Sequence, residues 1–454
     1  MPDNTPLPDD LPEFLRRMLS GEGEFGDINA RLSEMGIDTS TVWAGLSRMQ
    51  AQSAQDPWDQ ALQRALHLAN KDDQGLGVGN AASLAEAISL ANLWLGETTT
   101  ISELGELPTP MTRGQWVTQT MPTWREIAEP VGTSVADALI AALGDNVPEE
   151  MQSMVAGAGQ FMRTMGTSLF AAQLGQIIGT LSLEVVTGGD VSIPVLPAGT
   201  AAVIPQNLAA FGEGLEISDD QVALYLSARE LAYARLYRHA KWLRLSIMSQ
   251  ITDFARGVRI DVDAMREKAE GLDPENLEEL RTAIEGGALI PEHSEAQKEA
   301  LARLEHLVAV IDGWVDVVTA HATARLPDAT RLAETSRRRR AAGGPAENAL
   351  GALVGLTLRP KRLREAAAMW EAITAAVGIE ARDSLWDYSD LMPTPADIDD
   401  PAALIARLQA AARGEDAAPD DMDEALARLL SGEEPEGPAE NPEAPEAGPG
   451  ETPV

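Results

Sequence analysis

Apolar residues recur at the spacing of an α-helix through most of this chain. The stretch "WREIAEPVGTSVADALIAALG", residues 124–144, is typical, and its terminal glycine ends the pattern. In "ISDDQVALYLSARELAYARLYRHAKWL", residues 217–243, Ser218 is a candidate N-cap followed by two aspartates, where the helix dipole favours carboxylates. Further helices are predicted at residues 247–260, 275–285, 294–325, 360–378 and 400–412. The pattern therefore predicts a mainly α-helical protein.

Residues 190–205, "DVSIPVLPAGTAAVIP", interrupt the helical pattern. Two runs containing β-branched residues flank "PAGT" there, which predicts one small β-hairpin. The apolar stretch before it, residues 168–186, contains two glutamines and a glutamate. These polar residues favour a buried helix of a soluble fold over a membrane-spanning helix. We expect no association with a membrane.

Composition divides the chain into a folded body with two different ends. From residue 415 to the C-terminus, thirteen acidic residues face one basic residue, Arg428, and such a segment buries too little apolar surface to fold. The expected parts are a mobile N-terminal arm with a short helix (1–25), a helical region (26–150), a core (151–412), and a disordered acidic tail with one short helix (413–454).

Charge and cysteine content narrow the possible partners. The 454 residues include no cysteine and carry a net charge of −36. The lack of cysteine excludes disulfides and thiolate zinc sites. Because it also suits a reducing compartment and the N-terminus does not resemble a signal peptide, we expect a cytoplasmic protein. The charge argues against a nucleic-acid partner. We interpret "RRRR", residues 337–340, as an exposed basic turn between helices that pairs with carboxylates, with phosphate binding as the alternative.

The two ends of the chain share a short helical pattern. Residues 8–22, "PDDLPEFLRRMLSGE", and residues 419–433, "PDDMDEALARLLSGE", are identical at ten of fifteen positions. Each has an acidic start, a stripe of Leu or Met, and Ser-Gly as a stop signal. Chance recurrence of good capping residues and a duplicated docking motif for a protein partner explain the repeat equally well. The sequence leaves the oligomeric state open.

Several blocks of the chain carry a resemblance to a known family. Between about residues 115 and 412 they are similar, in order, to the actinobacterial zincin-like metallopeptidase family, whose members are often labelled candidate hydrolases. The blocks are "MGTSLFAAQLGQIIGTLSLEVVTGGDVSIP", "LSARELAYARLYRHAKWL", "IDGWVDVVTAHATARLP", "RRRR", "LVGLTLRPKRLREAAAMWEAI" and "RDSLWDYSDLMPTPADIDDP". The resemblance implies a zincin-like helical core.

Better-preserved members of that family resemble zinc proteases with H-E-x-x-H on one helix and a further ligand downstream. Histidines at i and i+4 share a helix face and can both hold Zn²⁺, while the glutamate can deprotonate the metal-bound water. By this resemblance Glu230 has the general-base position, and Arg229 and Tyr233 have the two histidine positions. Trp314 of "IDGWVDVV" has the third ligand's position. Arginine has no lone pair and a phenol is a poor ligand, so a vestigial site without a metal cofactor is implied.

Two acidic residues are possible neighbours of this site. Asp312 and Asp316 are spaced i and i+4 on one predicted helix, although such a pair is more often part of a solvated face. If Arg229 is buried, it is expected to pair with Asp316 or with neighbours of Glu230 and hold the old site together. A metal site built from Glu230, Asp316 and a downstream histidine remains open.

Three functions are compatible with these patterns. The chain is either a catalytically degenerate family member that acts as a binding or regulatory module, an active zinc-dependent hydrolase with unidentified ligands, or an interaction protein that works through its terminal helices. Zinc is expected only in the second case.

Overall fold

The computed structural model describes residues 56–144, 167–256 without Leu169 and Ser192, 294–341, Ala349, Gly351 and 361–413. Several expectations lie outside these residues: the N-terminal arm, the tail beyond Arg413, both terminal helices, the helix at 275–285 and the boundary at residue 150.

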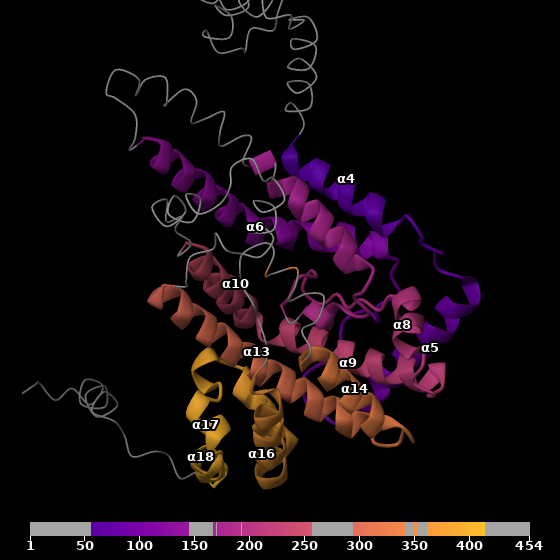
Figure 1. Ribbon diagram of the computed structural model, residues 1–454. Coiled ribbons are helices and arrows are strands. Elements are labelled where there is room, and N and C mark those ends of the chain that lie inside the picture. The colour runs from indigo at the N-terminus through magenta and orange to yellow at the C-terminus, as the bar shows by residue number, and fades with distance from the viewer. Residues whose placement is uncertain are drawn as a thin grey trace, which may run out of the picture.

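The described residues form helices almost throughout, which confirms the mainly α-helical class (Figure 1). The α-helices are α4 (Pro57–Ala69), α5 (Val78–Gly96), α6 (Arg113–Gly144), α8 (Pro205–Gly212), α9 (Asp219–His239), α10 (Lys241–Arg256), α13 (Glu295–Ala322), α14 (Ala329–Ala341), α16 (Leu363–Asp383), α17 (Pro395–Asp399) and α18 (Ala402–Ala412). Short 3-10 helices are η2 (Gly188–Val191), η3 (Ser384–Trp386) and η4 (Ser389–Leu391), and residues 170–182 are also helical. In the described part of the chain, no helix has both the length and the apolar character needed to cross a membrane.

The expected β-hairpin is reduced to one antiparallel bridge, between Thr187 and Val203. The second predicted run pairs with residues before the first run, because Gly188 N–H donates to Ala202 O at 3.0 Å. The first run instead begins as η2 and continues through two prolines, which lack the N–H groups that a ladder requires. The segment therefore forms two irregular arms joined by the bridge.

Helix α9 lies at the centre of the fold (Figure 1) and contacts α5, α8, α10, α13, α14 and η2. Every residue from Tyr225 to Leu236 is buried, so the helix has no solvated face along this length. Two aspartates occupy its first turn, as the sequence predicted. The single helix expected to reach residue 243 is two helices, because the backbone leaves the helical region at Ala240 and α10 begins at the next residue.

A cluster of tryptophans packs α10, α13 and α16 against η3. Trp386 stacks on Trp370 at a centroid distance of 5.4 Å and meets Trp314 edge-on at 6.2 Å. Trp242 lies 6.5 Å from Trp386 on another side. The loop after α16 is therefore ordered by buried aromatic area, as the sequence predicted, and side chains from α4 to α18 share one core.

Candidate functional site

The two positions matched to zinc-binding histidines face α13 in the interior. Arg229 and Tyr233 are one turn apart on α9, and Asp312 and Asp316 are one turn apart on α13, so each pair lies on one helix face. Tyr233 Oη donates to Asp312 Oδ1 at 2.5 Å, and Arg229 Nη2 donates to Tyr233 Oη at 3.1 Å. Arg229 Nη1 lies 3.9 Å from Asp316 Oδ1. The expected pairing of a buried Arg229 with Asp316 is confirmed.

Two arginines of α14 complete this group. Arg337 donates through Nε and Nη2 to Asp316 Oδ2, at 3.0 and 2.5 Å, and Arg340 donates to Asp312 Oδ2. The "RRRR" run is thus part of a helix and not an exposed turn, because positions 337 and 340 share the face that packs on α9 and α13. The expected pairing with carboxylates is confirmed for both. We call Arg229, Tyr233, Asp312, Asp316, Arg337 and Arg340 the arginine cluster.

Burial and charge fix the protonation states in the arginine cluster. Burial opposes the charge of Arg229, but Tyr233, Tyr225 and the two aspartates raise its pKa overall, so it stays a cation. Burial also raises the pKa of Tyr233 well above its usual value, despite the nearby guanidinium of Arg229, so the phenol stays neutral. The position of the second histidine therefore carries a hydrogen-bond donor at every physiological pH.

The residues of the arginine cluster do not fit a zinc ion. Three guanidiniums face two carboxylates, which leaves one net positive charge, and both aspartates already accept hydrogen bonds from arginine or tyrosine. A divalent cation would be repelled by the net positive charge, and the one carboxylate oxygen of the cluster without a hydrogen bond, Asp316 Oδ1, lies 3.9 Å from the Arg229 guanidinium. Within the described residues, no group of three or more His, Asp or Glu side chains is placed to hold a metal. The alternative site of Glu230, Asp316 and a histidine is therefore not assembled.

The histidines have other surroundings. His239 pairs with Asp387, His306 contacts Pro393 O, and His321 pairs with Glu371. His67 is exposed on α4, and His293 lies outside the described residues.

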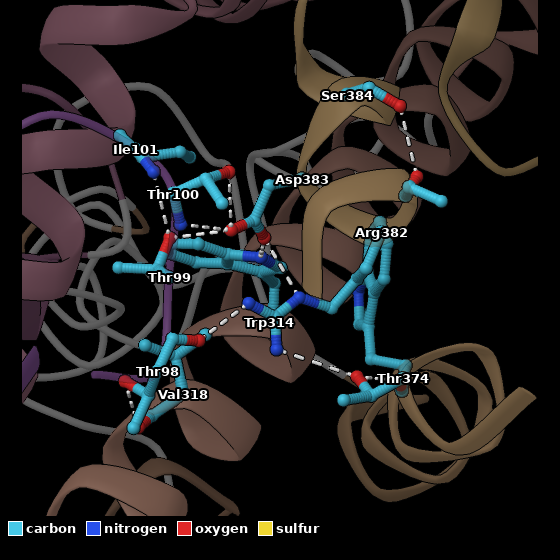
Figure 2. A network of polar contacts seen from close by, with 12 residues as sticks. Thr98, Thr99, Thr100, Ile101, Trp314, Val318, Thr374, Arg382, Asp383 and Ser384 are labelled. Carbon is cyan, nitrogen blue, oxygen red and sulfur yellow. Dashed lines mark hydrogen bonds and ion pairs between the residues drawn. The ribbon is translucent and has the colours of Figure 1, made fainter. Parts of the chain in front are cut away.

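Trp314 does not join the arginine cluster. It is two residues from Asp312 and from Asp316, or about 200° around the helix, so it faces the other side of α13. There its Nε1 donates to Asp383 Oδ1 at 2.9 Å (Figure 2). The same carboxylate accepts from Arg382 Nε at 2.8 Å and from Thr99 Oγ1 at 2.7 Å. The structure places Trp314 in a network that joins α13, α16 and the segment after α5 that contains Thr99. Helix α13 meets positions 229 and 233 through its aspartates.

Glu230 faces away from the arginine cluster, toward residues 185–204. Its Oε2 accepts the N–H of Gly189 and its Oε1 accepts that of Ala202, both at 2.7 Å. Burial raises the pKa of Glu230 to about 7, although the two N–H groups oppose the shift. A side chain at position 189 is excluded, because a Cβ would lie 2.2 Å from the Tyr233 ring. A cavity of about 40 Å³ adjoins the carboxyl group.

The sequence did not identify Arg337 and Arg340 as members of a buried site. The sequence contains one signal for this: the two arginines are three residues apart, so they share a helix face, and the apolar Leu332 and Ala333 precede them. A basic run in a solvated turn needs no such apolar residues nearby, so the pattern favours a helix packed on the core. The "TGGD" run at 187–190 was a second signal, because adjacent glycines often mark a close approach of backbone to a neighbouring group.

Comparison with known proteins agrees with this architecture. The sequence profile of the zincin-like metallopeptidases matches residues 57–405, so the chain belongs to the zincin-like metallopeptidase family. The match begins well before residue 115, the approximate start of the region whose blocks resemble the family. A search of curated proteins finds no match.

A solved structure shows the same fold. The crystal structure of a candidate hydrolase with a novel fold, from Chloroflexus aurantiacus, aligns with a TM-score of 0.53 over 78% of this chain and 98% of that one. At 18% sequence identity the likeness concerns the fold alone.

Proposed function

We propose that this chain is a catalytically degenerate member of its family and acts as a binding or regulatory module. The observation that carries the proposal is the arginine cluster at the positions matched to the metal-binding motif. A peptidase of this class needs an open cation site with a bound water. Here the matched positions hold a permanent cation and a neutral phenol that are hydrogen-bonded to each other and buried.

The arginine cluster supports a structural role for the former site. It connects α9, α13 and α14 through charge-assisted hydrogen bonds. Removing one partner of a buried ion pair typically costs about 3–5 kcal/mol, because the remaining charge is stranded. The charged side chains therefore fix the positions of α9, α13 and α14 relative to one another. In a metallopeptidase a metal ion would connect the ligands at the matched positions instead.

The direct test is the metal content of protein purified without an affinity tag. We expect zinc far below one equivalent by mass spectrometry, before and after incubation with zinc and gel filtration. Stoichiometric zinc that survives gel filtration would overturn the proposal and favour the active hydrolase.

A matched pair of variants tests the assignment of positions. The first carries Arg229→His, Tyr233→His and Arg340→Gln, which frees Asp312 to join two histidines. The control carries Arg229→His, Trp314→His and Arg340→Gln, with one of its two histidines on the opposite face of α13. We expect only the first variant to gain zinc affinity. Its affinity should be weaker than that of an evolved zinc site by roughly 10–100-fold, because the residues that orient the ligands are missing. Equal binding by the two folded variants would contradict the assignment.

The repeated terminal segments support a second proposal, that the module engages a protein partner through residues 8–22 and 419–433. The two segments are identical at ten of fifteen positions, and both have Leu or Met at the four stripe positions, which suits a helix that docks in an apolar groove. The lack of cysteine supports a cytoplasmic setting. Pull-downs from cytoplasm with the full chain and with residues 415–454 deleted test the idea. Loss of specific proteins on deletion is expected, and identical recovery would contradict it.

A further inference from the structure

One carboxyl group fastens both arms of the segment between residues 185 and 204 to α9. The Glu230 oxygens accept the N–H groups of Gly189 and Ala202, which flank the bridge between Thr187 and Val203. The two arms are thus tied to the buried helix at a single side chain.

Among the residues that the structure describes, this buried carboxyl group has no cationic partner. Glu230 is 2% exposed, and in the described part of the chain its partners are the two N–H groups and the Thr187 hydroxyl. An ionised carboxylate here loses its hydration and gains no opposite charge, and two N–H groups offset that loss only in part.

The titratable groups packed around Glu230 do not supply the missing charge. Asp190, on η2, is a second acid that opposes ionisation of Glu230. Tyr233 and Tyr237, on α9, are phenols whose pKa values burial raises, so both are neutral. The guanidiniums of Arg244 on α10 and Arg340 on α14 are bound to carbonyl and carboxylate oxygens of other residues.

The surroundings of Glu230 allow local opening. The cavity of about 40 Å³ that adjoins it is lined by both arms and by Tyr233, Tyr237 and Arg244, and it has room for one or a few water molecules. Gly199, between the arms, has φ of +78°, a conformation that glycine adopts without strain. Separation of the arms from α9 would bring water to the carboxyl group. It would break the hydrogen bond from Arg340 Nη1 to Asp190 O, but the bond from Arg340 to Asp312 within the arginine cluster does not involve the arms.

We propose that Glu230 is a pH-sensitive latch: as a neutral acid it keeps residues 185–204 closed on α9, and as a carboxylate it favours a locally open segment in which water reaches it through the cavity. The inference does not depend on the loss of catalysis. The raised pKa of Glu230, about 7, places the transition near neutral pH. At pH values between the ordinary pKa of a glutamate and this raised pKa, Glu230 is protonated in the closed form and ionised in the open form. The open population therefore rises about tenfold per pH unit in this window.

Amide hydrogen exchange on the full chain tests the latch. Protection of the Gly189 and Ala202 amides is measured from pH 5 to 8, corrected for the intrinsic exchange rate, with amides of α13 as an internal reference. In the wild type we expect opening to grow by about tenfold per pH unit up to pH 7 and then level off. In Glu230→Gln, which keeps the shape and cannot ionise, opening is expected to be independent of pH.

The matched control is Glu126→Gln. Glu126 binds Arg244 beside the same cavity but is 54% exposed, so its loss should leave the pH dependence unchanged. A pH-independent wild type, or a pH dependence retained in Glu230→Gln, would overturn the latch. If Glu230→Gln does not fold, carbon NMR of the Glu230 carboxyl in the wild type decides. A titration midpoint near 7 supports the proposal, and one below 5 refutes it.

Discussion

Replacing Asp312 with asparagine is the sharpest test of the charge balance in the arginine cluster. The substitution keeps the shape of the side chain and an oxygen for the Tyr233 hydroxyl, but it removes a negative charge. Three guanidiniums would then face one carboxylate, whereas three now face two. Replacing Arg229 with methionine has the opposite effect, because it leaves two guanidiniums opposite two carboxylates.

The two substitutions should therefore differ in cost. Asp312 is fully buried, and breaking a buried ion pair from one side costs about 3–5 kcal/mol. Arg229→Met loses the hydrogen bond to Tyr233, the contact of the guanidinium with the Tyr233 ring at 5.3 Å and the ion pair with Asp316 at 3.9 Å. Asp316 keeps its hydrogen bonds from Arg337. A hydrogen bond to a charged group contributes about 1.5–3 kcal/mol, and no charge is stranded. We expect Asp312→Asn to be the more destabilising.

Urea unfolding followed by tryptophan fluorescence at pH 7 measures both losses, read from the midpoint at an unchanged slope. Glu295→Gln, which removes one side of an exposed pair with Lys298, is the control and should leave the midpoint near that of the wild type. Equal losses for the two cluster variants, or a larger loss for Arg229→Met, would refute the charge argument.

Three further results are expected. Gly189→Ala should destabilise by about 1–3 kcal/mol in the same assay, because the new Cβ meets the Tyr233 ring at 2.2 Å, whereas Gly105→Ala, with nothing within 4 Å, should not. Asp383→Asn should cost about 3–5 kcal/mol, since it leaves the buried Arg382 without its carboxylate; a midpoint like that of the wild type would contradict this. The native pKa of Glu230, about 7, exceeds its ordinary 4.5, so its contribution to stability is complete below pH 4.5 and is lost as pH rises through 7. The stability of the wild type relative to Glu230→Gln should therefore fall by about 3 kcal/mol across that window, and a constant difference would exclude the shift.

The sequence predicted helices well because their apolar periodicity is local. It also predicted that a buried Arg229 pairs with Asp316 or with neighbours of Glu230, and the structure shows the first of these pairings. It did not predict which face of α13 meets α9. Matching blocks in order assigned Trp314 to the site, but the direction of a side chain depends on helix rotation, and that is set by the tryptophan cluster and Asp383. The β-hairpin was also beyond local reasoning, because the partner of residues 202–204 lies before the turn that seemed to pair them.

The arginine cluster also limits which single substitutions the interior of this chain can accept. Its six side chains come from three helices, and both α13 carboxylates bind guanidiniums of α14. A single substitution such as Arg229→His would place one imidazole next to the two remaining arginines, Arg337 and Arg340, which still bind the α13 carboxylates. Building a cation site here would require changes on α9 and α14 together, because the arginines of α14 bind both α13 carboxylates. The interlocked charges thus couple the three helices, so that a change of charge on one helix requires a matching change on another.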